Sequence, residues 1–169
     1  MVKKSSRPMF ILLAVALLIS ILLVTVIALK PLPRLIWNAS ESVPIGFYWI
    51  EKRSPYVGEI AVLKPPEWVQ LIADERNYLP NFAWLLKPVI ATRGAVVCRF
   101  GRFVFVDGKL VARAHYRDKV GRKLPIWRGC KALRSDHVFL LSKHRDSFDS
   151  RYFGPVDTTL IIGAAKRLL

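Results

Sequence analysis

The hydrophobic positions of this chain form one long run, in which only Ser20 and Thr25 are polar, followed by many short ones. The long run, MFILLAVALLISILLVTVIAL at residues 9–29, contains no charged residue, no glycine and no proline. A helix rises about 1.5 Å per residue, so a run of this length reaches across a bilayer core about 30 Å thick. We therefore expect a transmembrane helix at 9–29. The alternative, a cleaved secretory signal, would have a shorter apolar region that ends in a small-residue cleavage site.

Basic residues flank this run on both sides. Lys3, Lys4 and Arg7 precede it, which favours a cytoplasmic N-terminus, whereas Lys30 and Arg34 follow it and weaken that bias. A folded domain crosses the membrane regardless of its own charge, because the rule applies to short flanking loops. The expected order is a cytoplasmic N-terminus, a transmembrane helix, a linker and an extracytoplasmic domain, at residues 1–8, 9–29, 30–37 and 38–169.

Beyond the linker, short runs of apolar and alternating residues predict β-strands. GFYWIE at 46–51 alternates in character, and EIAVL at 59–63 is a compact apolar run. Further strands are expected at 83–90, 95–100, 102–106, 109–112 and 137–141. The Asp107-Gly108 pair is typical of a tight hairpin turn, because both residue types tolerate positive φ.

One segment between these strands has helical periodicity. EWVQLIADERN at 67–77 places Trp68, Leu71, Ile72 and Glu75 on one side of a helix. Many short strands at close spacing, with only one short helix among them, predict a mainly β domain that is coiled or barrel-like.

The chain is strongly basic, with a formal net charge of +15 at pH 7. Setting aside the three basic residues before the long run leaves 24 basic against 12 acidic residues, a net charge of +12 for the rest. Solubility and attraction to an anionic membrane surface account for such a charge. We do not expect nucleic-acid binding, because the sequence has no helix-turn-helix, zinc-finger or RNA-binding signature.

The chain has two cysteines, Cys98 and Cys130. An even number in a domain outside the cytoplasm favours a disulfide bond. A zinc site is the alternative, but neither cysteine belongs to a CxxC pair and the three histidines show no ligand spacing. We expect no metal and no cofactor.

Three short islands of sequence stand out as sites for chemistry, at residues 38–49, 84–94 and 142–156. In the second island, Lys87 is flanked by apolar residues, and in a strand it would share a face with Leu85 and Val89. A lysine held against such a face loses hydration, its pKa falls, and the neutral amine is a usable general base. The alternative is a lysine that extends along a strand edge into solvent.

The first island, NASESVPIGFYW, contains Ser42 just before Val-Pro. An isolated serine in this position is usually an ordinary turn residue. A serine paired with a lysine is nevertheless a known nucleophile–base arrangement that needs no histidine. Ser42 and Lys87 therefore become informative only when they are considered together.

The three islands, in this order behind one apolar N-terminal segment, resemble the bacterial signal peptidase superfamily, and most of all the TraF-like conjugative-transfer signal peptidases. NASESVPIGFY is similar to their N-x-S-x-S-x-P-x-G-x-Y box, in which the nucleophile would be Ser42. Lys87 occupies the general-base position of their K-R-V-x-x-x-x-G box, although Pro88 stands where an arginine is usual. DSFDSRYFGPV at 146–156 closely matches their D-S-x-D-S-R-Y-F-G-P-V box.

The resemblance implies a role for several further residues. The hydroxyl of Ser40 and the backbone N–H of Ser42 would stabilise the oxyanion, and Ser147 would orient the lysine amine. Asp149 and Arg151 would form a buried ion pair. Two alternatives stay open at this point: Asp149 and Arg151 form an ordinary surface pair, or Asp146 is the structural acid. Both cysteines fall where the TraF group has them.

Taken together, the residues and the resemblance imply a membrane-anchored serine endopeptidase that removes leader peptides. It would have a signal-peptidase-like, coiled antiparallel β domain behind its transmembrane helix, and it would lie in the bacterial inner membrane with its catalytic domain in the periplasm. The substrate would be a precursor protein, either a conjugative pilin or another secreted preprotein, and the partners would be the lipid bilayer and the conjugation machinery.

Three other interpretations stay open from the sequence. The chain could be a general type I signal peptidase, although that enzyme usually has one more residue between its serine and proline. It could instead be a non-enzymatic, single-span subunit of a conjugation or secretion apparatus. Histidine-dependent hydrolysis would have to use His144, the only histidine in an island.

Overall fold

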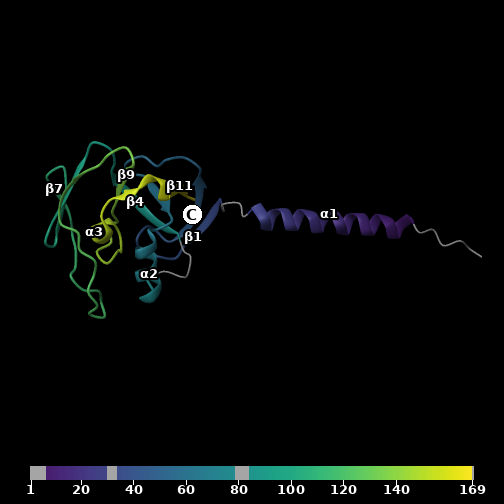
Figure 1. Cartoon of the computed structure of the whole chain (residues 1–169), viewed down its shortest axis with the longest axis horizontal. Helices are drawn as coiled ribbons and strands as arrows, with labels where there is room; N and C mark the ends of the chain where they lie inside the picture. Colours follow the sequence, from purple (N-terminus) through teal and green to yellow (C-terminus); the bar gives the residue numbers. More distant parts are fainter. Residues whose placement is uncertain (1–6, 30–33, 79–83, 169) are drawn as a thin grey trace, which may run out of the picture. The chain divides into compact units, whose positions relative to one another are not determined.

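The computed structural model describes residues 7–29, 34–78 and 84–168, and the chain divides into two compact units, 1–33 and 34–169 (Figure 1). Several expectations lie partly outside the described residues: most of the cytoplasmic N-terminus, the linker residues 30–33, and residue 83 at the start of one expected strand.

The first unit consists of helix α1 (Arg7–Leu29), which covers the whole apolar run. The large apolar side chains from Met9 to Val24 are mostly exposed within this unit. In the described part of the chain, no helix is both long enough and apolar enough to cross a membrane. The helix is therefore confirmed, and the membrane span expected at 9–29 stays a prediction.

The second unit is built on two antiparallel sheets. Listed in spatial order, the larger sheet has seven strands: β1 (Leu35–Asn38), β2 (Gly46–Glu51), β11 (Ile161–Arg167), β3 (Ile60–Leu63), β4 (Leu85–Ala91), β9 (His137–Leu140) and β10 (Val156–Asp157). The smaller sheet has four: β7 (Lys109–Arg113), β6 (Phe103–Val106), β5 (Val96–Phe100) and β8 (Gly129–Ala132). All pairs between these strands are antiparallel, so the expectation of a mainly β domain is confirmed.

The helical content differs from the expectation of one short helix in this domain. Besides α2 (Glu67–Glu75), the domain contains the one-turn helix α3 (Ser150–Phe153) and the 3₁₀ turn η1 (Thr158–Leu160). The Asp149 side chain accepts a hydrogen bond from the Arg151 N–H and so caps α3. A helix of one turn is too short to show a periodic pattern, which explains why the sequence did not predict it.

The face that α2 buries also differs from the prediction. Val69 and Ala73 are the fully buried residues of this helix, whereas Trp68 and Leu71 are exposed. Val69 packs in a cluster with four residues from elsewhere in the domain, namely Ala114, Leu124, Phe148 and Tyr152. Of the predicted face, Ile72 is partly buried and packs against the same cluster, so the prediction is correct for Ile72 and wrong for Trp68 and Leu71.

The expected hairpin turn joins β6 and β7. Asp107 and Gly108 have φ values of 48° and 75°, in the left-handed region that a tight primed turn requires. On the far side of the same sheet, β5 pairs with β8, and this register places Cys98 directly opposite Cys130. The two cysteines form a disulfide bond, as expected from the sequence.

Strand β4 lies between β3 and β9 in the larger sheet and carries the lysine of the second island. Lys87 lies opposite Ala61 on β3. Its strand neighbours Leu85 and Val89 belong to the main hydrophobic cluster of this sheet. The sheet therefore fixes Lys87 on an apolar, central strand, and its side chain is only 3% exposed.

Candidate active site

The turn that carries Ser42 is organised by a buried asparagine. The side-chain amide of Asn38 donates to the carbonyls of Ser40, Val43 and Pro44, at 2.8, 3.0 and 3.1 Å. The Tyr48 hydroxyl donates to the same Pro44 carbonyl at 2.7 Å. These bonds hold residues 39–45 as a compact connection between β1 and β2, with Ser42 presented from it. Asn38 was not predicted to have a role, although the Asn of the first island's box was the available signal.

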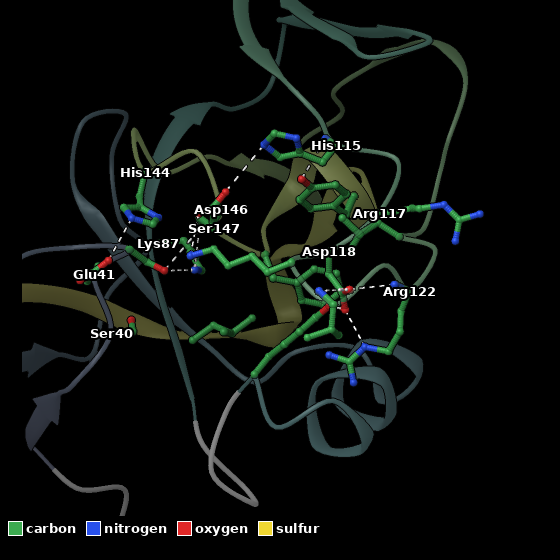
Figure 2. A pocket seen from close by; sticks show the side chains of 18 residues that line it. Ser40, Glu41, Lys87, His115, Arg117, Asp118, Arg122, His144, Asp146 and Ser147 are labelled. Atoms are coloured by element: carbon green, nitrogen blue, oxygen red, sulfur yellow. Dashed lines mark hydrogen bonds and ion pairs between the residues drawn. The ribbon is translucent and has the colours of Figure 1, made fainter.

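Three side chains from distant parts of the chain meet beside this turn (Figure 2). The Lys87 Nζ lies 2.5 Å from the Ser42 Oγ and 2.8 Å from the Ser147 Oγ. The two serine oxygens lie 3.3 Å apart, at hydrogen-bond distance. The structure therefore brings together the serine of the first island, the lysine of the second and a serine of the third.

The environment of Lys87 favours its neutral form. Burial in the apolar core lowers the pKa of its amine from 10.5 to about 8. The negative charge of Asp149 opposes this shift, and the positive charge of Arg151 adds to it. A useful fraction of the amine is thus unprotonated near neutral pH and able to accept a proton.

Asp149 and Arg151 form a buried, bidentate ion pair. The Arg151 Nε and Nη2 lie 2.7 and 2.9 Å from the two carboxylate oxygens, and both side chains are almost fully buried. Arg151 also donates to the carbonyls of Ser142, His144 and Arg145. The pair therefore holds residues 142–145 in a fixed path and is not a solvent-exposed surface pair.

Ser142 connects this ion pair to the serine turn. Its hydroxyl donates to the Ser42 carbonyl and accepts from the His144 N–H at 3.0 Å. Its own backbone N–H donates to the Asp149 carboxylate at 3.0 Å. Sequence reasoning missed this residue, because a single serine at the start of a loop carries no recognisable signal.

Asp146 lies in a different environment from Asp149. Its carboxylate is partly exposed and lies 2.9 Å from the Lys119 Nζ and 3.7 Å from the His115 Nε2 (Figure 2). The buried acid of the third island is consequently Asp149, and Asp146 belongs to the surface around the cavity.

Ser40 and His144 lie near Ser42 but have other partners. The Ser40 hydroxyl donates to the Asn38 Oδ1 at 3.0 Å. The His144 Nε2 lies 3.0 Å from a carboxylate oxygen of Glu41, the residue before Ser42. The oxyanion role of Ser40 stays a prediction, and His144 pairs with a surface carboxylate.

A cavity of about 470 Å³ opens beside the three meeting side chains. Its polar wall includes Ser40, Ser42, Lys87 and Ser147. Its apolar and aromatic lining includes Leu85, Leu124, Phe148 and Tyr152, and charged residues also line it. A peptide carbonyl that enters this cavity would meet the serine hydroxyl with the amine behind it. In the described residues, no cluster of three or more His, Cys, Asp or Glu side chains is arranged to hold a metal ion.

The chain is similar to known proteins over most of its length. Residues 7–169 match the family described as signal peptidase, peptidase S26. A plasmid transfer protein TraF of Escherichia coli is 31% identical over 144 residues, covering 78% of this chain and 81% of that protein. A probable conjugal transfer protein TraF of Sinorhizobium fredii (strain NBRC 101917 / NGR234) is 36% identical over 143 residues, covering 78% and 75%. Among solved structures, this chain matches the crystal structure of a signal peptidase I from Enterococcus faecalis V583. The match covers 68% of this chain and 98% of the chain in that crystal structure, with 17% sequence identity and a TM-score of 0.37.

Proposed function

The chain belongs to the signal peptidase family, peptidase S26, and we propose that it is a serine endopeptidase in which Ser42 is the nucleophile and Lys87 the general base. The observation that carries this proposal is that the Ser42 Oγ and the Ser147 Oγ both lie within hydrogen-bond distance of the buried Lys87 amine. A nucleophile and a base within hydrogen-bond reach, with a third group that orients the base, is the arrangement that covalent catalysis requires.

In the proposed reaction, the Ser42 Oγ attacks the carbonyl carbon of the scissile peptide bond while neutral Lys87 accepts the hydroxyl proton. The resulting ammonium gives that proton to the leaving amine, the C–N bond breaks, and an ester to Ser42 remains. Water then attacks the ester, with the same amine as base, and the serine is restored. Ser147 accepts a hydrogen bond from the Lys87 Nζ throughout and keeps the amine directed at Ser42.

The negative charge that develops on the carbonyl oxygen needs hydrogen-bond donors about 2.7–3.1 Å away. We assign this role to the backbone N–H of Ser42 and the hydroxyl of Ser40. The Ser40 hydroxyl donates to Asn38 in the absence of substrate, so it must rotate towards the oxyanion when a peptide binds.

We further propose that residues 9–29 anchor the enzyme in the bacterial inner membrane, with its N-terminus in the cytoplasm and its catalytic domain in the periplasm. The run has no charged residue, and its described large apolar side chains are exposed around the helix, as they would be when facing lipid. The Cys98–Cys130 disulfide suits an oxidising compartment. Ser42 follows the helix closely in the chain, so the nucleophile would lie near the membrane surface.

The proposed substrate is the precursor of a conjugative pilin, which would be cleaved beside its apolar leader, and the conjugation machinery is the proposed partner. Support comes from the relatives, which are described as plasmid and conjugal transfer proteins and cover most of this chain. A general signal peptidase would instead process many secreted precursors. Cleavage of a pilin precursor measured against an unrelated preprotein separates these two specificities.

The test of the proposed function is processing of such a precursor by the full chain and by two variants, Ser42→Ala and Lys87→Ala. Asp146→Asn serves as the control, because Asp146 lines the same cavity but contacts neither reacting group. We expect both variants to lose processing and the control to keep it. Processing by both variants would exclude Ser42 and Lys87 as the reacting pair, and absence of processing by the native chain would favour a non-enzymatic subunit. Loss in Ser42→Ala alone would assign the base elsewhere.

A further inference from the structure

A second hollow, of about 450 Å³, is lined in part by Ser142, Lys143 and Arg145, and Ser42 is not among its lining residues. His115 lines both this hollow and the first cavity. Four exposed cations line the second hollow, namely Arg102, Arg113, Lys143 and Arg145, and its described lining contains no aspartate or glutamate.

These four cations have no acidic partner within the described part of the chain. Other surface cations of this domain do form such pairs, for example Lys119 with Asp146 and Arg122 with Asp118. None of the four cations that line the hollow makes an ion pair. Like charges around one concave surface repel each other unless an anion lies between them.

Two of the cations are held in place by the smaller sheet. The Arg102 Nε donates to the Ala114 carbonyl at 3.1 Å, and its guanidinium lies over the Tyr116 ring. The Arg113 guanidinium lies over the Phe103 ring, 5.6 Å from its centroid. Because these contacts fix the two guanidiniums, an incoming anion would not have to order them.

The other two cations come from the loop at residues 142–145, which the buried ion pair holds. Lys143 and Arg145 lie on this loop, and the Arg145 carbonyl accepts a hydrogen bond from Arg151. Arg151 itself lines the hollow, but Asp149 neutralises its charge and backbone carbonyls take its N–H groups. The donors free to bind a ligand are therefore those of the four exposed cations.

We propose that this hollow binds a phosphate-type oxyanion, either as a free ion or as the headgroup of an anionic phospholipid. Guanidinium and ammonium groups from two segments of the chain that line one hollow suit the tetrahedral oxygens of a phosphate, because each such hydrogen bond is charge-assisted. The proposal concerns a surface outside the catalytic cavity, and it does not depend on the proposed peptidase reaction.

The experiment is isothermal titration calorimetry on the full chain in a neutral detergent, at constant ionic strength. Three probes are compared: inorganic phosphate, dihexanoyl phosphatidylglycerol and dihexanoyl phosphatidylcholine. The test variant is Arg113→Gln/Lys143→Gln, which removes one cation from each of the two segments that line the hollow. The control variant is Lys109→Gln/Arg128→Gln, which removes the same charge from exposed positions outside the hollow.

We expect saturable binding of phosphate, phosphatidylglycerol or both, weakened at least about tenfold in the test variant and less than about twofold in the control. Binding of phosphate alone identifies a soluble anion, and binding of phosphatidylglycerol but not phosphatidylcholine identifies the lipid headgroup. The proposal is overturned if neither anion binds saturably, or if both double variants weaken binding equally. Because heat is measured rather than cleavage, either result leaves the peptidase proposal to its own test.

Discussion

The Lys87 Nζ lies 2.5 Å from the Ser42 Oγ, although 45 positions of the chain separate the two residues. Strand β4 buries the lysine in the larger sheet, and the turn held by Asn38 brings the serine to it. The amine is therefore both close to the hydroxyl and depleted of hydration.

The first prediction concerns the pH dependence of cleavage. The proposed base acts only when it is neutral, and its pKa is about 8. The turnover rate should therefore rise about tenfold per pH unit well below pH 8, bend near that value and level off above it. The measurement is the initial rate of cleavage of a saturating leader-peptide substrate across this range. A rate that falls with pH, or does not change, would contradict the role of Lys87.

The second prediction concerns stability. The folded chain holds the Lys87 proton more weakly than the unfolded chain, whose lysine keeps its ordinary pKa of 10.5. Below about pH 8, Lys87 is protonated in both the folded and the unfolded state, and the full free-energy cost of burying its charge is present. Between about pH 8 and 10.5, the unfolded state binds more protons than the folded state, so the stability of the fold rises with pH. Lys87→Met removes this cost.

At pH 7 the Lys87→Met variant should be more stable than the native chain, by on the order of 3 kcal/mol, and this advantage should shrink as the pH approaches 10. The measurement is the free energy of unfolding of both chains in denaturant at the two pH values. Other groups titrate equally in both chains and cancel. An advantage that stays constant with pH would show that folding does not lower the pKa of Lys87.

The third prediction concerns Ser142, which joins the Ser42 carbonyl to the His144 N–H. Ser142→Ala should leave that buried N–H without its acceptor and let the serine turn shift. We expect kcat to fall about tenfold or more with KM nearly unchanged, and the unfolding free energy to fall by about 1–3 kcal/mol. Ser54→Ala, at an exposed turn, is the control. Lower stability with an unchanged kcat would make Ser142 purely structural.

The fourth prediction compares the two acids of the third island. Asp149→Asn leaves the buried Arg151 without its counter-charge, which should cost about 3–5 kcal/mol of stability. Asp146→Asn breaks only a partly exposed pair with Lys119 and should cost less than about 1 kcal/mol. Thermal or denaturant unfolding of the two variants measures the difference. Equal costs would contradict the assignment of Asp149 as the structural acid.

Much of the β structure is predictable from short sequence patterns. The prediction of residues 46–51 as a strand matches β2 at both ends, and the helix expected at 67–77 begins where α2 begins. Strands with weak patterns were missed. β8 (Gly129–Ala132) has no apolar alternation, and β11 (Ile161–Arg167) has glycine and alanines at its centre, so only pairing with other strands identifies them.

The candidate site was less predictable from local sequence patterns than the β-strands. Its lysine, seen locally, is one basic residue in an apolar strand, and only the family resemblance connects it to Ser42 and Ser147. The structure supplies what no local pattern contains, namely the convergence of three islands through the pairing of β4 with β3 and β9. Asn38 and Ser142 act through hydrogen bonds to backbone groups, and such bonds leave almost no trace in the sequence.

Detection of the covalent intermediate is the most direct test of Ser42 as the nucleophile. A leader-peptide ester substrate is mixed with the full chain, the reaction is quenched in acid within its first turnover, and the digested protein is analysed by mass spectrometry. We predict that the acyl group of the substrate is attached to the Ser42 hydroxyl, and that Ser42→Ala forms no adduct and cleaves no substrate. An acyl group on another residue, or cleavage that persists in Ser42→Ala, would show that Ser42 is not the nucleophile.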